Sequence, residues 1–423
     1  MERHRRKLWK RFFPPRGSDL SAQPSTRLKL IEEETNPNPK MQGTASFKVV
    51  HLTSVHSAFD TRIFVKECRS LARAGFQVTI IAPHTEDTIV DGVRIKAVPP
   101  IKNKGRIQRM TSTAWHVFRE AWRENGDIYH FHDPELIPEA LALRAFGKKV
   151  VYDIHENVPE DILLKQYLPL WSRRLISWLV GGVESSASRR FSALVTVSPM
   201  IAERFMTANP RTVLVHNFPE PKELTAAAEH PWERREPMVA FPGGILPERG
   251  IRQMVHAMAC FPESANARLE IASTEFPKNL WDELTQHPGW HRVRYLGHLN
   301  RKQVVEMLGR ASAGLVLYLP EGQNHCAMPH KLFEYMAAGI PVIATDLPLW
   351  RRLLDGIDCA LFVDARKPQS IAEAIQHVID HPEEAAKMGR IGREAVHTRY
   401  NWESQAKELV KLYGGLLEMP CAE

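Results

Sequence analysis

The chain has 423 residues, of which 43% are hydrophobic and 25% charged, a composition typical of a water-soluble protein with two domains. The longest apolar run, residues 175–183, is too short to cross a bilayer. The five cysteines form no Cys-x-x-Cys pair, which argues against a disulfide framework and a zinc site, so we expect a cytoplasmic protein.

The net charge of +7 is concentrated near the N-terminus, where residues 3–16 carry seven Arg and Lys side chains. The remainder is close to neutral, and no interleaving of basic and aromatic residues typical of single-strand binding occurs. We therefore expect no nucleic-acid partner.

Residues 1–46 contain five prolines and no sustained periodicity, and are predicted to form a flexible basic N-terminal extension. On a short helix, Leu8, Trp9, Phe12 and Phe13 would share one side, flanked by basic residues, a pattern suited to an anionic membrane surface. That interpretation predicts a peripheral protein on the inner face of the plasma membrane. The alternatives are a disordered tail, or a true start at Met41.

Residues 47–217 alternate strand and helix, which predicts a first α/β domain built on a doubly wound parallel sheet. An amphipathic helix is expected over residues 62–74, and a longer one over 169–191. The strands are expected at residues 47–52, 78–82, 94–98, 128–132, 149–153 and 194–197.

Three of the expected strand ends are rich in imidazoles and carboxylates, in residues 51–62, 130–135 and 153–157. Ligands of such sheets bind beyond the carboxyl ends of the strands, so these segments predict a polar crevice. The candidate acceptor-side residues are His56, Asp60, Arg62, His132, Asp133 and Glu156.

In the helix over residues 169–191, the face that includes Leu175, Ile176, Leu179 and Val183 is expected to be core. A further helix should begin after Ser198, whose side chain is a suitable cap.

A proline-rich linker is predicted over residues 218–236, followed by a second domain over 237–400 and a last helix within 401–423. The strands of the second domain are expected at residues 238–241, 269–272, 293–296, 314–318, 342–344 and 361–363, and the tail helices at 371–379, 385–400 and 402–417.

The first loop of the second domain contains Gly243, Gly244, Arg249 and Gly250, and precedes a helix over residues 251–259. Glycines allow backbone amides to approach a phosphate, and a guanidinium offers it paired donors. The spacing is neither Gly-x-Gly-x-x-Gly nor a Walker A sequence, so a diphosphate cradle without dinucleotide or ATP specificity is predicted.

Residues 329–345 read PHKLFEYMAAGIPVIAT, a short helix, a Gly339 stop and a buried strand. Lys331 and Glu334 share the polar face of the helix, whose N-terminus attracts anions. Taken alone, the two side chains could equally be a solvated ion pair.

This segment, with the glycine loop before it, resembles the donor-binding region of glycosyltransferase family 4, the retaining transferases of GT-B fold, and the resemblance extends over residues 47–417. It implies two Rossmann-like domains that face a cleft, with the C-terminal helix crossing back to the first domain. It also implies a bacterial envelope polysaccharide enzyme.

By the same resemblance, Glu334 binds the donor ribose, Lys331 and Arg249 bind its diphosphate, and His155 lines the sugar pocket near the scissile bond. These four residues are the catalytic candidates. The donor-binding candidates are Gly243, Gly244, Arg249, Asn324, His325, Met328, Lys331 and Glu334.

Two positions depart from the family pattern. Gly244 stands where a basic residue is usual, and Cys326 stands where a glutamate usually contacts the donor sugar. A thiol cannot replace a two-oxygen acceptor, which leaves Glu321, Asn324 and His325 as candidates for that contact.

The sequence contains no Asp-x-Asp metal anchor, so a metal-independent, cofactor-free hexosyltransferase is expected, with a UDP- or GDP-linked sugar as donor and a glycan or lipid-linked acceptor. Family members are described as using same-face attack, in which a donor phosphate oxygen takes the acceptor proton. Asp60, Asp133 and Glu156 remain alternatives as base or nucleophile. The alternative functions are a sugar-nucleotide epimerase and a catalytically silent homologue that serves as a binding subunit.

Overall fold

The computed structural model of the protein describes residues 47–99, 106–164, 169–321, 324 and 327–417. The chain divides into two compact units, Met1–His216 with Ala406–Glu423, and Asn217–Gln405. The predicted membrane segment around Trp9 and the positions His325 and Cys326 lie outside the described residues.

Within the described residues, the first unit is built on an eight-stranded sheet with the order β3-β4-β2-β1-β5-β6-β7-β8. All neighbouring strands are parallel except β3 and β4, which form an antiparallel hairpin. The strands are β1 (Lys48–Leu52), β2 (Gln77–Pro83), β3 (Thr88–Val90), β4 (Val93–Val98), β5 (Ile128–Phe131), β6 (Lys149–Ile154), β7 (Ala193–Thr196) and β8 (Thr212–Leu214). The parallel α/β class predicted from the sequence is confirmed, whereas β3 and β8 were not predicted.

The strand order of this sheet reverses between β1 and β5, which pair in register from Val49 with Ile128 to Leu52 with Phe131. The chain winds outward from β1 in one direction and from β5 in the other, so the carboxyl ends of these strands flank the switch point of the sheet. The histidines predicted at strand ends lie at this position.

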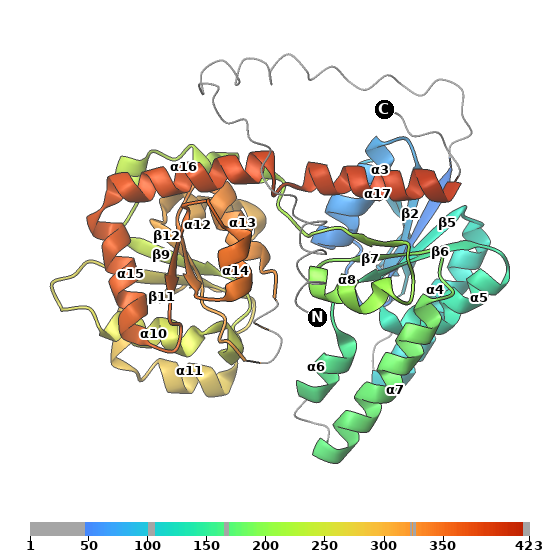
Figure 1. The fold of residues 1–423 in the computed structure, drawn as a ribbon, viewed down its shortest axis with the longest axis horizontal. Helices are drawn as coiled ribbons and strands as arrows, with labels where there is room; N and C mark the ends of the chain where they lie inside the picture. The colour runs from blue at the N-terminus through green and yellow to red at the C-terminus, as the bar shows by residue number, and fades with distance from the viewer. Residues whose placement is uncertain (1–46, 100–105, 165–168, 322–323, 325–326, 418–423) are drawn as a thin grey trace, which may run out of the picture. The chain divides into compact units, whose positions relative to one another are not determined.

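Helices cover both faces of the sheet (Figure 1). They are α3 (Arg69–Arg73), α4 (Arg106–Glu124), α5 (Ile137–Ala145), α6 (Val158–Leu164), α7 (Leu170–Ser188), α8 (Pro199–Met206) and, from Ala406 onward, the end of α17 (Trp402–Leu417). The Ser198 side chain caps α8 by accepting a hydrogen bond from Ile201 N, as expected.

Two expectations for these helices are wrong. The amphipathic segment after β1 is a π-helix over Thr61–Cys68, followed by the single turn α3. In α7, Leu175, Leu179 and Val183 are exposed and not core residues.

Within the described residues, the second unit contains a six-stranded parallel sheet with the order β11-β10-β9-β12-β13-β14. Its strands are β9 (Met238–Pro242), β10 (Arg268–Ala272), β11 (Val293–Tyr295), β12 (Ala313–Val316), β13 (Val342–Thr345) and β14 (Ala360–Val363). Its helices are α9 (Thr225–Ala228), α10 (Ile251–Ala259), α11 (Lys278–Leu284), α12 (Arg301–Arg310), α13 (His330–Ala337), α14 (Pro348–Leu353), α15 (Pro368–Asp380), α16 (Pro382–Thr398) and the first residues of α17. The switch point of this sheet lies between β9 and β12, beside the glycine loop that follows β9.

Helix α13 packs as its sequence predicts. Leu332, Phe333 and Met336 are buried, and Gly339 ends the helix with a φ of 69°. The buried face of α13 fixes which way its polar residues point.

Candidate active site

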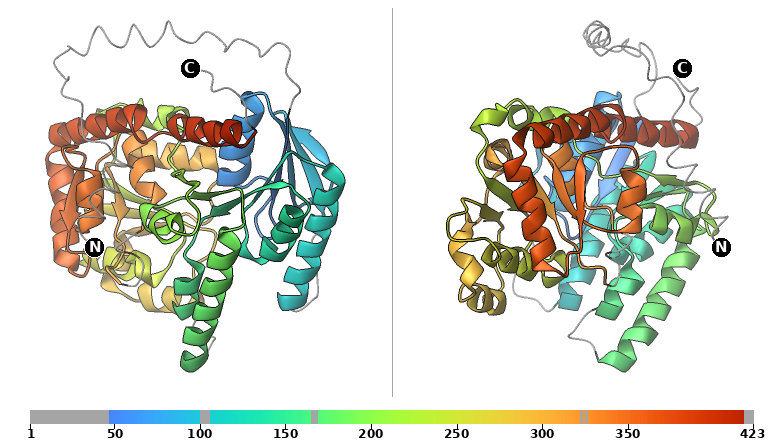
Figure 2. Two further views of the ribbon diagram at one scale, coloured as in Figure 1. Left: turned by 45° about the vertical axis from the view of Figure 1, so that its right-hand side comes forward. Right: turned by 60° about the vertical axis from the view of Figure 1, so that its left-hand side comes forward.

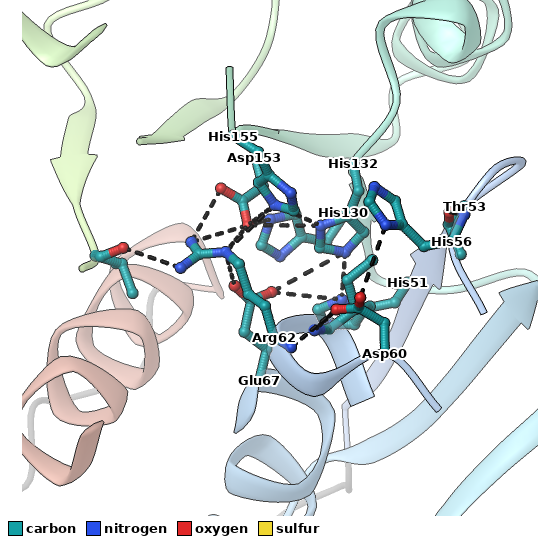
Figure 3. A network of polar contacts seen from close by, with 12 residues as sticks. His51, Thr53, His56, Asp60, Arg62, Glu67, His130, His132, Asp153 and His155 are labelled. Carbon is teal, nitrogen blue, oxygen red and sulfur yellow. Dashed lines mark hydrogen bonds and ion pairs between the residues drawn. The ribbon is translucent and has the colours of Figure 1, made fainter. Parts of the chain in front are cut away.

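A buried polar network lies at the switch point of the first unit (Figure 3). We call it the histidine–carboxylate cluster, and it consists of His51, Arg62, Glu67, His130, His132, Asp153 and His155. Strands β1, β5 and β6 supply the histidines and Asp153 at or just after their carboxyl ends, and the π-helix supplies Arg62 and Glu67. π-Helices are rare and often mark functional sites.

Arg62 holds Asp153 through two hydrogen bonds of 3.1 Å, from Nε to Oδ2 and from Nη2 to Oδ1. Its Nη1 donates to the Val215 carbonyl at 3.1 Å. Burial alone would raise the pKa of Asp153, but the charges of Arg62 and His155 outweigh burial and hold that pKa well below its usual value. Asp153 is therefore ionised.

Glu67 is the opposite case. It is fully buried, and its Oε1 lies 3.1 Å from Arg62 Nε without hydrogen-bond geometry. Burial, and then the charge of Asp153, raise the pKa of Glu67 well above its usual value. The pKa values of the two buried carboxyl groups are thus shifted in opposite directions.

Burial disfavours the charged form of the three buried histidines of the cluster. His51 Nδ1 and His132 Nε2 lie 3.0 Å apart, and His130 Nδ1 lies 2.6 Å from the Tyr413 hydroxyl on α17. Burial, more than any neighbouring charge, lowers the pKa of all three.

The same groups have the composition of a divalent-metal site. Ligand atoms of His51, Glu67, His130 and His132 lie within 4.8 Å of one another. Imidazoles with one carboxylate suit zinc. Zinc ligands lie about 2 Å from the ion, so these atoms would have to move closer together to bind it. No metal was predicted from the sequence, because it contains neither a Cys-x-x-Cys pair nor an Asp-x-Asp motif.

His155 lies on the exposed side of the cluster, with 18% of its side chain accessible, and its Nε2 is 2.9 Å from Asp153 Oδ2. Asp153 therefore orients the imidazole that the sequence analysis placed near the scissile bond.

The other acceptor-side candidates gather around His56, whose ring nitrogens lie 3.7 Å from Asp60 and 3.3 Å from Asp133. Asp60 caps the π-helix by accepting hydrogen bonds from Arg62 N and Ile63 N. Asp133 is buried and accepts a hydrogen bond of 2.7 Å from Thr53 Oγ1. Both carboxylates therefore stabilise the local structure, whatever their chemical role.

Glu156 is exposed and follows His155 in the chain. Five of the six acceptor-side candidates thus have mapped contacts with one another or with the cluster.

In the second unit, the glycine loop and α13 bring two cations together. A Cβ on Gly243 would lie 2.2 Å from Lys331 Nζ, and a Cβ on Gly244 would lie 3.0 Å from Arg249 Nη1. Arg249 Nη1 also donates to the Gly244 carbonyl at 3.3 Å. We call Gly243, Gly244, Arg249 and Lys331 the cation–glycine loop.

The Lys331 ammonium is incompletely satisfied. Burial, and then the charge of Arg249, lower the pKa of Lys331 to about 8. Its Nζ lies 5.0 Å from the centroid of the Phe241 ring, and in the described part of the chain no group accepts a hydrogen bond from it. A half-buried ammonium in this state favours an anionic ligand.

The remaining donor-side candidates have structural contacts. Glu334 Oε1 lies 2.7 Å from Arg301 Nη1, and Arg301 also pairs with Glu223. Asn324 Nδ2 donates to the carbonyls of Glu248 and Leu319, both at 3.0 Å, while Met328 is half-buried.

Sequence patterns did not predict five residues of the site, His51, Glu67, His130, Asp153 and Tyr413. His51, His130 and Asp153 lay within the polar segments that were predicted, at positions expected to be inside strands. Glu67 was missed because a π-helix does not follow the 3.6-residue period, and Tyr413 because it is distant in sequence.

Two α/β units, each built on a largely parallel sheet, are the architecture of the GT-B glycosyltransferases. Residues 61–222 match the family model described as Glycosyltransferase Family 4, and residues 249–411 match the model described as Glycosyl transferase-like. The chain is therefore similar to glycosyltransferases, and its residues 61–222 are similar to those of family 4.

Relatives and solved structures agree with this assignment. The chain is 24% identical over 355 residues to a phosphatidyl-myo-inositol mannosyltransferase of Mycobacterium leprae, covering 80% of this chain and 88% of the relative. Sucrose-phosphate synthase of Thermosynechococcus elongatus has a TM-score of 0.69 at 19% identity, covering 88% of this chain and 99% of that structure. Anabaena HepE in complex with UDP and glucose has a TM-score of 0.65 at 13% identity, covering 87% and 99%. At these identities the structural matches show the fold alone.

Proposed function

We propose that the protein is a retaining hexosyltransferase that moves a sugar from a UDP- or GDP-linked donor to a glycan or lipid-linked acceptor in envelope polysaccharide synthesis. The observation that carries this proposal is the convergence of Lys331 and Arg249 on Gly243 and Gly244. The mannosyltransferase relatives and the UDP complex of a structural neighbour support the choice of donor class.

In this proposal the cation–glycine loop binds the donor diphosphate. Gly243 and Gly244 allow the phosphates to approach the backbone, and Arg249 and Lys331 neutralise the charge that develops as the sugar leaves. Each charge-assisted hydrogen bond contributes about 1.5 to 3 kcal/mol. These groups stabilise the leaving group without a metal ion.

The proposed reaction breaks the bond between the anomeric carbon and the diphosphate while the acceptor oxygen attacks from the same face. The acceptor proton passes to a departing phosphate oxygen, so the products are the glycoside and the nucleoside diphosphate. His155, oriented by Asp153, supplies a hydrogen bond to the donor sugar.

A thermal-shift panel tests the donor class directly, since a ligand that binds the folded state raises the melting temperature by mass action. The panel contains UDP, GDP, ADP and the corresponding sugar nucleotides. The proposal predicts stabilisation by UDP or GDP and their sugars. Stabilisation by none of them would contradict it.

The second candidate is a catalytically silent binding subunit. It is favoured by the ion pair between Glu334 and Arg301, because Glu334 is the residue expected to bind the ribose. Incubation with labelled sugar nucleotides and an envelope lipid extract separates the two. Transfer of label supports the enzyme, and binding without transfer or hydrolysis supports the subunit.

A further inference from the structure

Helix α7 presents an apolar face to solvent. The exposed fractions are 76% for Trp171, 52% for Leu175, 73% for Trp178, 50% for Leu179 and 59% for Val183. Spacings of three and four residues place all five side chains on one stripe of the helix. Figures 1 and 2 show α7 as a long helix that extends away from the sheet of its own unit.

The opposite, more polar face of α7 packs against the protein. Glu184 is buried and pairs with Arg204 at 2.7 Å, and it accepts a hydrogen bond of 3.0 Å from the Tyr152 hydroxyl. Ser177 Oγ donates to the Pro159 carbonyl of α6 at 2.6 Å. These contacts fix the rotation of the helix, so the outward direction of the apolar stripe is built into the fold.

The exposed charges of α7 itself are basic. Arg174 is exposed between Trp171 and Trp178 on the same face, and Arg189 and Arg190 are exposed just beyond the end of the helix. From residue 171 to 190, all of them described, the one carboxylate is the buried Glu184.

We propose that α7 docks on the surface of an anionic lipid bilayer, with its apolar stripe in the boundary between headgroups and acyl chains and its arginines on lipid phosphates. Tryptophans combined with basic residues and no exposed acid are typical of interfacial helices. A second copy of the chain fits less well, because symmetric pairing of two stripes would bring arginines together with no carboxylate to neutralise them.

Among the described helices, none is both long and apolar enough to span a bilayer. Docking by α7 therefore gives the first unit a membrane contact that is independent of the N-terminal basic segment. It deepens the proposed function and rests on it, because it places the sheet that carries the acceptor-side candidates at a surface where a lipid-linked acceptor is available.

Vesicle sedimentation with the full chain tests the docking. Vesicles of phosphatidylcholine alone are compared with vesicles containing 30% phosphatidylglycerol. We expect binding to the anionic vesicles, weakened more than tenfold by Trp178→Glu with Leu179→Glu. Arg174→Ala with Arg190→Ala should weaken it by about 25-fold, at roughly fivefold for each arginine near the surface.

Two controls use the same chain. Ile89→Glu changes an exposed apolar residue of β3 in the same way, and Trp9→Glu with Phe12→Glu changes the N-terminal segment; we expect both variants to keep at least half of the binding. Failure of the wild-type protein to bind anionic vesicles, or equal binding by the α7 variant, would overturn the proposal. So would conversion of a dimer to a monomer by the α7 substitutions in the absence of lipid, with vesicle binding retained.

The nucleoside diphosphate titration separates this inference from the proposed function. A folded α7 variant should bind the nucleotide as the wild-type protein does. Loss of vesicle binding with intact nucleotide binding supports docking by α7. Loss of both in the α7 variant identifies a folding defect. The milder variant Trp178→Gln with Leu179→Gln then repeats the test without added charge.

Discussion

Lys331 Nζ occupies the position that a side chain on Gly243 would need, since a Cβ built there would lie 2.2 Å from it. The φ of Gly243, 151°, is also one that other residues rarely adopt. The lysine can lie where it does only because residue 243 has no side chain. The substitution Gly243→Ala should therefore disturb the cation–glycine loop.

We predict that Gly243→Ala displaces the Lys331 ammonium and weakens nucleoside diphosphate binding by about tenfold, the loss of one charge-assisted hydrogen bond. Isothermal titration calorimetry measures the effect. Gly414→Ala is the control, because a Cβ on Gly414 in α17 meets nothing within 4 Å. Equal affinity in both variants would show that the ammonium is not a ligand contact.

Nucleotide affinity should fall as the pH rises through about 8, the pKa of Lys331. The lysine is charged below that pH, and its neutral form above it cannot neutralise a phosphate. The diphosphate keeps its charge through this range, so the change near pH 8 does not come from the phosphates. Lys331→Arg keeps its charge and should give a flat profile from pH 7.5 to 9.5. A matching decline in that variant would assign the titration to another group.

The two buried carboxylates of the histidine–carboxylate cluster should respond differently to amide substitution. Asp153→Asn removes the charge that pairs with the buried Arg62 guanidinium and should cost about 3 to 5 kcal/mol of unfolding free energy. Glu67→Gln resembles the protonated native side chain and should cost less than about 1.5 kcal/mol. Urea unfolding at pH 7 measures both, and the reverse order would show that the proton lies on Asp153.

Glu67 should also give the protein a characteristic pH dependence. Its pKa is raised on folding, so above the unfolded value of 4.5 the folded state retains a proton that the unfolded state has lost. Stability from this group is therefore present at low pH and declines as the pH rises above 4.5. Urea unfolding from pH 5 to 9 should show a shallower decline in Glu67→Gln than in the wild-type protein.

His216 should make the folded state less stable as the pH falls, the opposite of the effect of Glu67. Burial lowers its pKa from 6.5 to about 4. The unfolded state binds the proton first, so stability is lost as the pH falls from 6.5 to about 4, by about 3 kcal/mol in total. His216→Asn should remove that part of the acid slope, with thermal melts between pH 4 and 7 as the measurement. An unchanged slope would exclude His216 as its source.

Local patterns predicted the parts of the fold that local sequence determines. Buried strands such as β9, the Ser198 cap and the Gly339 stop all have short-range signals. The hairpin between β3 and β4 also has a short-range signal, the Asp91-Gly92 pair, whose residues both adopt the positive φ of a tight hairpin turn. That hairpin was missed because three residues are too few to show alternation.

The candidate site was predictable only where its residues follow strands. Glu67 faces the histidines because the backbone is a π-helix, which hydrophobic periodicity does not reveal. Tyr413 reaches His130 from α17, a contact between residues 283 positions apart. For α7, periodicity identified an apolar face but could not say whether protein or solvent lies against it, because the polar face is held by Arg204 and Tyr152.

The central claim is that Arg249 and Lys331 bind the diphosphate of a sugar nucleotide, and calorimetric titration of UDP and GDP into single variants tests it most directly. Arg249→Ala and Lys331→Ala should each weaken binding by about 10- to 100-fold. Arg252→Ala, a matched change on α10 at an arginine that pairs with Glu283, should bind as the wild-type protein does. Equal affinity in all three variants and the wild-type protein would contradict the account.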